Sequence, residues 1–215
     1  MVLILTMNDI KGIIPRLTLK GFLLFLGTFV LIFASAKLGQ YLFFSWKTSP
    51  AILWPPTGIG LSILWLGGYR YAVPIFFALL LASITGPANH LIPAVVTTPV
   101  GQVFGQVVGV YLLRRSGFTG TFATVRNVAL FLGIIIVACM VAPTITTLIS
   151  VATGNLSTAA YISWSRAWAG YIFSCLILAP FILTWWKSET STIRNSSLES
   201  GFVGLLLIIS VYFLF

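Results

Sequence analysis

The chain has 215 residues, of which 59% are hydrophobic and 7% are charged, and its mean hydropathy is +1.06. A soluble domain carries about 25% charged residues, so this composition excludes a soluble globular protein, a secreted disulfide scaffold and a nucleic-acid-binding module. The net charge of +9 arises because only three acidic residues oppose twelve Lys and Arg. In a membrane protein such an excess reports the orientation of the loops before it suggests an anionic partner.

The distribution of apolar residues predicts an all-α fold, a polytopic bundle of transmembrane helices. Stretches of about 20 apolar residues, the length that crosses a bilayer as a helix, alternate with short polar breaks. This division gives six complete spans and part of a seventh, at residues 21–44, 51–66, 71–85, 93–113, 125–151, 163–186 and 201–215. Residues 1–20 are expected to form a cytoplasmic segment and residues 21–215 a transmembrane domain truncated at its C-terminus, because the last stretch is apolar to its end.

Two prolines, Pro74 and Pro143, bear on the shape of the predicted spans, because a proline disturbs a helix interior. The third span is short for a bilayer and contains Pro74, so we expect it to begin in the membrane interface or to kink. The fifth span carries Pro143 in its interior.

The basic residues predict which side of the membrane each loop faces. With a cytoplasmic N-terminus, nine of the twelve Lys and Arg lie inside, and only Lys37, Lys47 and Arg166 lie outside. Basic residues concentrate in the cytoplasmic loops of membrane proteins. We therefore expect a multi-pass protein of the bacterial inner membrane with its N-terminus in the cytoplasm.

The densest local signal is at the outer end of the second span, in the run Trp54, Pro55, Pro56, Thr57 and Gly58. Two prolines suit the first turn of a helix, where a missing N–H costs nothing, and a Trp suits the membrane interface. Free backbone N–H groups and the positive end of the helix dipole would point outward, where an anionic or polar ligand could bind. The alternative is a rigid helix start with an interfacial Trp and no ligand.

The fourth span carries three glycines at a spacing of four residues, and a Gln follows two of them: Gly101, Gln102, Gly105, Gln106 and Gly109. The glycines create a smooth helix face for close packing. The two amides lie on an adjoining strip, deep enough that each must find a partner within the bundle or across a dimer interface. One interpretation is internal packing, and the other is the polar wall of a ligand cavity or the seam of a homodimer.

Further polar and aromatic residues are expected on the outer side. Asn89 and His90 fall in the turn between the third and fourth spans, and Arg166 and Trp168 begin the sixth. Under the predicted topology they share the depth of Trp54, and together with the run that starts there they make up a predicted outer ligand pocket. Each of them alone also fits a solvated loop or an interface anchor.

The sequence offers little for catalysis or for metal binding. It contains three carboxylates, one His and two Cys, and no acid or base is placed to activate its hydroxyls. Cys139 and Cys175 lie inside the fifth and sixth spans, where we interpret them as small apolar core residues. We therefore expect no catalytic residue, no metal, no cofactor and no nucleic-acid partner for this chain, and a lipid bilayer around it.

Short motifs occur in a consistent order along the chain: residues 54–59 (WPPTGI), 67–71 (GGYRY), 82–84 (ASI), 112–115 (LLRR) and 168–171 (WAGY), with Pro180 nine residues after the last. On these motifs the chain resembles the first type of membrane-associated sensor domain, MASE1. The resemblance extends from about residue 34 over nearly the whole remaining chain.

The resemblance implies an eight-helix bacterial sensory module, N-terminal to a cytoplasmic diguanylate cyclase (GGDEF), phosphodiesterase (EAL) or histidine kinase. The chain departs from the family pattern at Tyr171, where the family commonly has Asp, and at Ser174, where it has Gly. A sensing role that depends on that carboxylate therefore does not carry over.

A small membrane transporter or channel is the competing function, because spans broken by proline and strips of amides also occur in transporters. Against it, no charged residue lies in the middle of a predicted span, and an ion-coupled carrier generally needs one. No inverted repeat is evident either. The sequence therefore favours a sensory input domain that perceives a small ligand or a partner membrane protein and controls an output domain.

Overall fold

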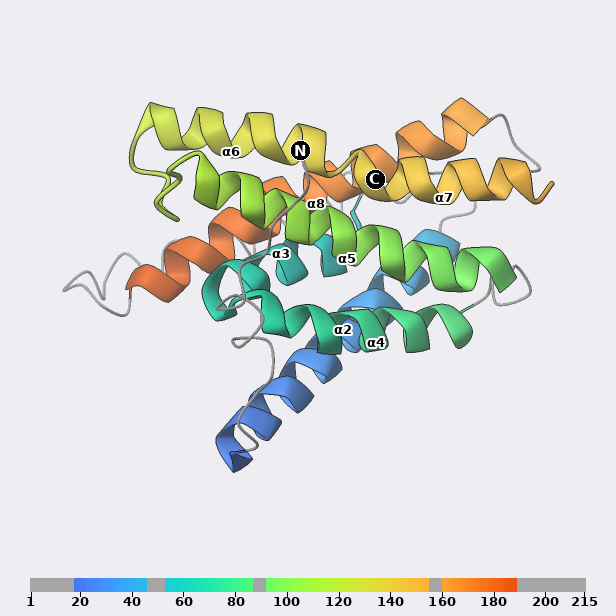
Figure 1. Cartoon of the computed structure of the whole chain (residues 1–215), viewed down its shortest axis with the longest axis horizontal. Helices are drawn as coiled ribbons and strands as arrows, with labels where there is room; N and C mark the ends of the chain where they lie inside the picture. The colour runs from blue at the N-terminus through green and yellow to red at the C-terminus, as the bar shows by residue number, and fades with distance from the viewer. Residues whose placement is uncertain (1–17, 46–52, 87–91, 155–159, 189–215) are drawn as a thin grey trace.

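The computed structural model describes residues 18–45, 53–86, 92–154 and 160–188, and every regular element in these ranges is a helix. In chain order they are α2 (Leu19–Ser45), α3 (Pro55–Gly67), the 3₁₀ helix η1 (Tyr69–Tyr71), α4 (Ala72–Ile84), α5 (Ile92–Arg115), α6 (Val125–Ala138), α7 (Val141–Ala152) and α8 (Ala160–Ser188) (Figure 1). The predicted all-α fold is confirmed for these ranges. The predicted seventh span lies outside the described residues.

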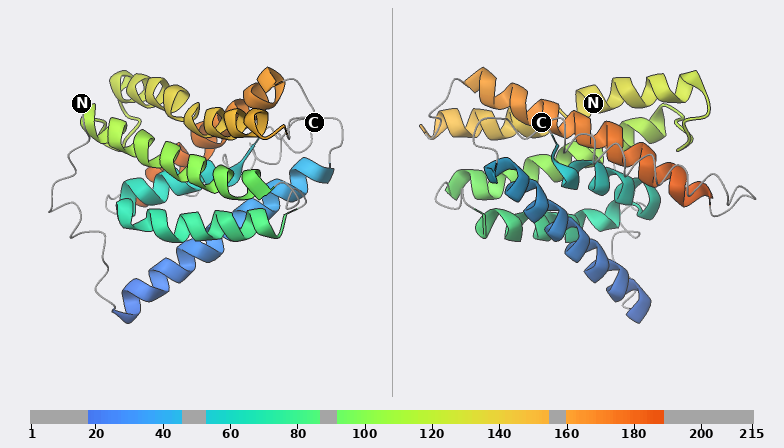
Figure 2. Two further views of the ribbon diagram at one scale, coloured as in Figure 1. Left: turned by 45° about the vertical axis from the view of Figure 1, so that its right-hand side comes forward. Right: turned by 180° about the vertical axis from the view of Figure 1, so that it is seen from behind.

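The short helix α3 lies inside the bundle, where it packs mainly against α8 and also against α2 and α5. α6 and α7 follow one another nearly end to end on the side of the bundle opposite α2 (Figure 1, Figure 2). α5 packs on α7, and α4 packs on α2. The core therefore includes Leu61 and Leu64 of α3, Val110 of α5 and Cys175 of α8, all of which are buried.

The sequence limits α3 at both ends. Pro55 and Pro56 occupy its first turn, where a helix accepts prolines without losing a hydrogen bond. After its last residue, Gly68 has a φ of 88°, a conformation that residues with a side chain rarely adopt. The chain turns there, and η1 leads into α4, whose Pro74 falls in the first turn rather than in the helix interior.

The predicted fifth span consists of two helices, α6 and α7, separated at Cys139 and Met140. Pro143 explains the break, because it has no N–H to donate to the carbonyl of Cys139 four residues earlier and its ring crowds that carbonyl. At the break, the N–H of Met140 donates to the carbonyl of Val137 at 3.1 Å, and this spacing of three residues makes a tighter turn than an α-helix. The helical ladder is therefore interrupted inside the bundle.

Four segments of the described residues are long and apolar enough to cross a membrane: Leu19–Tyr41, Val95–Arg115, Val125–Ala152 and Trp164–Trp186. They correspond to the first, fourth, fifth and sixth predicted spans. The second and third correspond to shorter apolar helices, α3 with 13 residues and the segment Tyr69–Ile84. By length and composition, the described helices thus supply four spans where the sequence predicts six.

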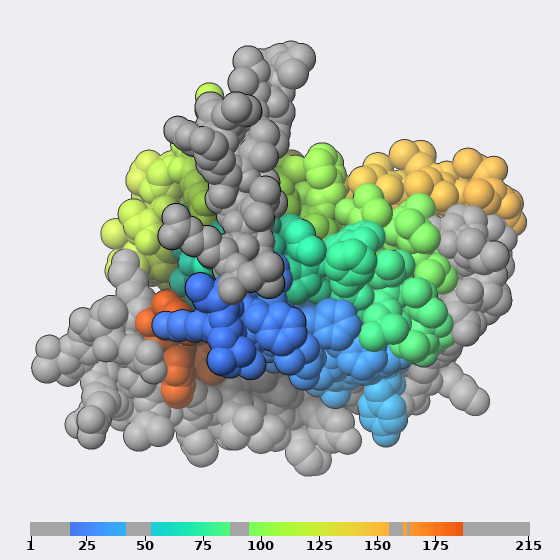
Figure 3. All heavy atoms as spheres, turned by 60° about the horizontal axis from the view of Figure 1, so that its bottom comes forward, coloured from blue at the N-terminus to red at the C-terminus, as the bar shows by residue number. Residues whose placement is uncertain are grey.

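The face of α2 that points away from the bundle is apolar and exposed. Phe22, Leu26 and Val30 on this helix are each 47–57% exposed. Figure 3 shows the face of the molecule that α2 crosses, in blue. An exposed apolar surface of this length is unfavourable in water but matches the tails of a lipid bilayer, as a membrane protein requires.

Candidate functional site

Three hydrogen bonds join the start of α3 to the middle of α8. The N–H of Trp54 donates to the carbonyl of Gly170 at 3.3 Å, and the N–H of Gly58 donates to the hydroxyl of Ser174 at 3.1 Å. The same hydroxyl donates to the carbonyl of Pro55 at 3.4 Å. The two helices approach so closely that a Cβ on Gly58 would overlap the carbonyl oxygen of Ser174. Only a glycine therefore fits at position 58 without a shift of the two helices.

These bonds correct the prediction that the first turn of α3 offers free backbone N–H groups. Its two prolines have no N–H, and the N–H of Thr57 donates to the carbonyl of Trp54 at 3.1 Å. The N–H of Gly58 is occupied by α8. An anionic ligand therefore finds no free backbone donor at this turn, because each N–H there is either missing, bonded within the turn or bonded to α8.

The start of α3 also lies deeper than expected. Trp54 is bonded to Gly170, which lies well inside α8 rather than at its first residue, Ala160. At a rise of about 1.5 Å per residue, the N-terminal end of α8 extends roughly 15 Å beyond this contact. α3 therefore begins inside the bundle and not at the level where α8 begins.

The two amides of α5 bind the same region. Gln106 donates through Nε2 to the carbonyls of Pro56 at 3.1 Å and Thr57 at 3.4 Å. Gln102 donates through Nε2 to the phenolic oxygen of Tyr171 on α8 at 2.9 Å. Both Gln side chains are buried. Their amide donors thus find partners within one chain, so that α5 holds α3 with one amide and α8 with the other.

The glycine face of α5 lies against the junction of α6 and α7. A Cβ on Gly101 would lie 3.2 Å from the Cα of Ala142, and one on Gly105 would lie 3.1 Å from the carbonyl oxygen of Ala138. A Cβ on Gly109 would lie 3.1 Å from the Cβ of Ala138. Such distances are shorter than ordinary van der Waals contacts, so the missing side chains allow the close approach of these helices.

A small cavity lies where these contacts meet, between α3, α5, α8 and the α6–α7 junction. Its volume is about 10 Å³. All of its lining residues are buried, and those that carry polar atoms in their side chains are Thr57, Gln102, Gln106, Tyr171, Cys139 and Cys175. We refer to this cavity and its six polar residues as the polar centre.

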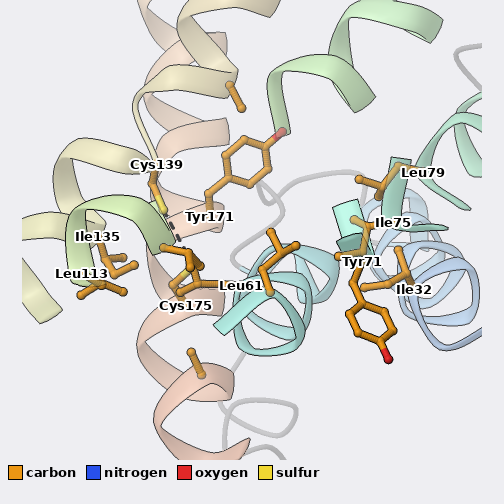
Figure 4. Close-up of a cluster of buried hydrophobic side chains, with 14 of the residues drawn as sticks. Ile32, Leu61, Tyr71, Ile75, Leu79, Leu113, Ile135, Cys139, Tyr171 and Cys175 are labelled. Atoms are coloured by element: carbon orange, nitrogen blue, oxygen red, sulfur yellow. Dashed lines mark hydrogen bonds between the residues drawn. The ribbon is translucent and has the colours of Figure 1, made fainter. Parts of the chain in front are cut away.

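The two cysteines form one side of the polar centre. Their Sγ atoms lie 3.9 Å apart, and Cys139 belongs to the α6–α7 break while Cys175 belongs to α8. Figure 4 shows the pair joined by a dashed line, next to the ring of Tyr171. Both are buried, as the sequence predicted, and their contact links the α6–α7 break to α8.

The two Trp residues of the predicted outer pocket pack toward different helices. The ring of Trp54 lies against α2, where a Cβ on Gly39 would be 3.1 Å from it. The indole N–H of Trp168 donates to the carbonyl of Ile136 on α6 at 3.1 Å, and its ring centroid is 5.2 Å from that of Trp164. Trp54 is joined to α8 through its backbone, while Trp168 serves the contact between α6 and α8.

The remaining residues of that pocket are less constrained by the structure. The side chain of Arg166 is exposed on α8, about one turn before Gly170. Asn89 and His90 lie outside the described residues. The outer ligand pocket as a whole therefore stays a prediction.

The sequence singled out Tyr171 and Ser174 as departures from the family pattern but did not predict the contacts that they make in the bundle. The hydroxyl of Tyr171 accepts from Gln102, and that of Ser174 bonds to both Gly58 and Pro55. The available signal was that both are polar residues inside an apolar span, at the two positions where the chain departs from the MASE1 pattern. Hydropathy alone gives no indication of which helix such a hydroxyl faces.

Comparison with known proteins gives one result that bears on function. The family model of MASE1 matches residues 21–215 of the chain. No curated protein and no solved structure matches.

Proposed function

The chain belongs to the MASE1 family of membrane-associated sensor domains, and from this premise we propose that it is the sensory input domain of a bacterial signalling protein. In this proposal the domain lies in the inner membrane, perceives a small ligand or a partner membrane protein, and controls a cytoplasmic output domain of the GGDEF, EAL or histidine-kinase type. The observation that carries the proposal is the family match, which extends over nearly all of the described helices.

The proposed topology has a cytoplasmic N-terminus and six spans, with α3 and the η1–α4 segment as the second and third. Alternate helices would then run in the same direction. Two contacts support this: Arg114 at the end of α5 donates to the carbonyl of Trp65 near the end of α3 at 3.0 Å, and Lys37 of α2 donates to the carbonyl of Thr85 at the end of α4 at 2.9 Å. The family would add further helices to complete eight.

In the proposed mechanism α3 carries the signal from the outer side to the cytoplasmic side. α3 is the element that contacts α2, α5 and α8 at once, and it is bonded to α8 at its start and to Arg114 at its end. A ligand or partner at the outer side, in the region of Trp54, Arg166 and the neighbouring loop, would favour one position of α3. A shift of that helix would change the spacing of the cytoplasmic helix ends that lead to the output domain.

A small transporter or channel is the second candidate function, and one observation favours it. The α6–α7 break, with a cavity beside it, is the kind of discontinuous helix that transporters use at their binding sites. The three acidic residues of the chain, Asp9, Glu189 and Glu199, all lie outside the described helices, so the described spans contain no carboxylate for coupling to an ion. We therefore place sensing first.

The first test is the reading frame downstream of the codon for Phe215. We expect it to continue through further apolar segments into an output domain. A frame that ends soon after this codon, with no soluble domain, would contradict the sensory function. The transporter would then be the remaining candidate function.

The second test uses the full-length protein in native membranes and measures its output activity with and without the signal. Trp54→Ala and Arg166→Ala should each reduce the response, while Trp186→Ala, which removes an exposed Trp at the other end of α8, should not. An unchanged response in both variants would reduce Trp54 and Arg166 to packing and interface residues.

A further inference from the structure

The polar centre contains hydrogen-bonding positions that have no partner in the described part of the chain. Thr57 Oγ1, Gln102 Oε1 and Gln106 Oε1 are buried and accept or donate no hydrogen bond there. Their side chains are only 2–6% exposed, and all three residues line the same cavity. A buried polar group without a partner costs about 1–3 kcal/mol, so three of them in one cavity point to a ligand.

A count of donors and acceptors defines the chemistry of that ligand. The two Gln oxygens are acceptors that lack a donor. The hydroxyl of Thr57 has a hydrogen without an acceptor, and so does that of Tyr171, whose oxygen only accepts from Gln102. The cavity therefore presents two free amide oxygens as acceptors and two free hydroxyl donors, beside the second N–H of Gln102. A molecule with two donors and two acceptors would satisfy all four groups.

The volume of the cavity and the absence of charge in its lining restrict the kind of ligand further. A cavity of about 10 Å³ is at the lower limit of what one water molecule occupies and is too small for an organic ligand. Its lining contains no charged side chain, so an inorganic cation or anion would be buried without a counter-charge, which is unfavourable. Water is neutral, has the right size and has two donors and two acceptors.

We propose that the polar centre is a binding site for a single water molecule. The water donates to Gln102 Oε1 and Gln106 Oε1 and accepts from the hydroxyls of Thr57 and Tyr171. It thereby links α3, α5 and α8 beside the α6–α7 break, in addition to the direct hydrogen bonds among these helices. This inference holds for a sensor and for a transporter alike.

Infrared spectroscopy of the 215-residue chain in lipid nanodiscs tests the proposal, with H₂¹⁶O and H₂¹⁸O as the only probes. The O–H stretch of a bound water shifts in H₂¹⁸O, whereas the phenol oxygen of Tyr171 does not exchange with solvent. The difference spectrum of wild type minus Tyr171→Phe should therefore contain an ¹⁸O-sensitive O–H band that belongs to the lost or displaced water.

Ser62→Ala is the matched control, because this hydroxyl is fully buried but donates to the carbonyl of Gly58 and does not line the cavity. Its difference spectrum should contain no ¹⁸O-sensitive band. If Tyr171→Phe does not insert into nanodiscs, the pair Thr57→Val and Thr57→Ser replaces it, since only Ser keeps the hydroxyl. The proposal is overturned if the difference spectrum of Tyr171→Phe, or of the Thr57 pair that replaces it, contains no ¹⁸O-sensitive band. It is also overturned if Ser62→Ala gives an equal band.

Discussion

At the residue scale, Gly58 shows how a single missing side chain can position a helix. Its N–H and its open Cα face both lie against Ser174 of α8, 116 residues later in the chain. A side chain there would meet backbone, which cannot rotate away as a side chain can. Hydropathy treats Gly58 as one of many small apolar residues, so no local pattern in the sequence reveals this contact.

Gly58→Ala should therefore destabilise the protein by about 1–3 kcal/mol through overpacking. Thermal unfolding in detergent measures this. Gly27→Ala is the control, because no atom lies within 4 Å of a Cβ at that position, and there Ala should be neutral or slightly stabilising. Equal unfolding temperatures for the two variants would show that α3 and α8 are not in close contact.

Arg114 stabilises the end of α3 from the neighbouring helix. Its Nη2 donates to the carbonyls of Leu64 at 3.3 Å and Trp65 at 3.0 Å, and its guanidinium lies 4.9 Å from the centroid of the Tyr69 ring. Both carbonyls belong to the last turn of α3, where a helix runs out of its own N–H donors, although the carbonyl of Leu64 also accepts from the N–H of Gly68 at 3.1 Å. A cation at this end of the helix dipole adds to the effect.

Replacing Arg114 by Gln should lower the free energy of unfolding by about 1 kcal/mol, a reduced value because the side chain is partly exposed to solvent. Arg115→Gln removes the same charge from the adjacent position and should have little effect. The comparison is made by unfolding in the same detergent. A larger loss for Arg115→Gln than for Arg114→Gln would contradict the capping role.

At the element scale, the glycine face of α5 determines how closely this helix approaches α6 and α7. Gly105→Leu should impair folding, with an overpacking cost of about 1–3 kcal/mol, because its Cβ would lie 3.1 Å from the Ala138 carbonyl oxygen. Gly133→Leu is the control, since a Cβ on that glycine of α6 has no neighbour within 4 Å. Unchanged thermal stability and oligomer size for Gly105→Leu would refute the contact.

Helix positions could largely be predicted from the sequence, and helix contacts could not. The span predicted at residues 93–113 and α5 agree closely, because apolar length is a local property of the chain. The sequence indicated Pro143 as a residue that disturbs a helix. The position of the break was not predicted, because it depends on the carbonyl of the residue four positions before Pro143. The prediction of free N–H donors at the start of α3 was wrong. The N–H of Gly58 donates to Ser174, which belongs to a helix distant in the sequence.

At the scale of the whole molecule, the proposed path of the signal depends on the orientation of the bundle in the membrane. The contacts of Arg114 with α3 and of Lys37 with the end of α4 place the ends of alternate helices together, as an alternating topology requires. The positive-inside rule then predicts that the loop between α5 and α6 lies in the cytoplasm, because Arg114, Arg115 and Arg126 flank it.

This orientation is tested by labelling engineered cysteines with a reagent that does not cross the membrane. Ala123→Cys, in the exposed loop between α5 and α6, should react only after the membrane is permeabilised. Tyr161→Cys, at the 73% exposed residue near the start of α8, should react from outside in intact cells. The reverse pattern would invert the topology and move the proposed signal-receiving side to the cytoplasm.

The measurement that tests the central claim most directly is the output activity of the full-length protein when the link between α5 and α3 is cut inside the membrane. Gln106→Leu removes the amide that bonds to the carbonyls of Pro56 and Thr57, while Phe104→Leu changes an exposed residue on the same helix. At equal amounts of membrane-inserted protein, Gln106→Leu should change the output by roughly five-fold or more, the usual scale of coupling between sites, and Phe104→Leu should leave it unchanged. Identical output from both variants and the wild type would contradict the claim that this helical bundle controls an output domain.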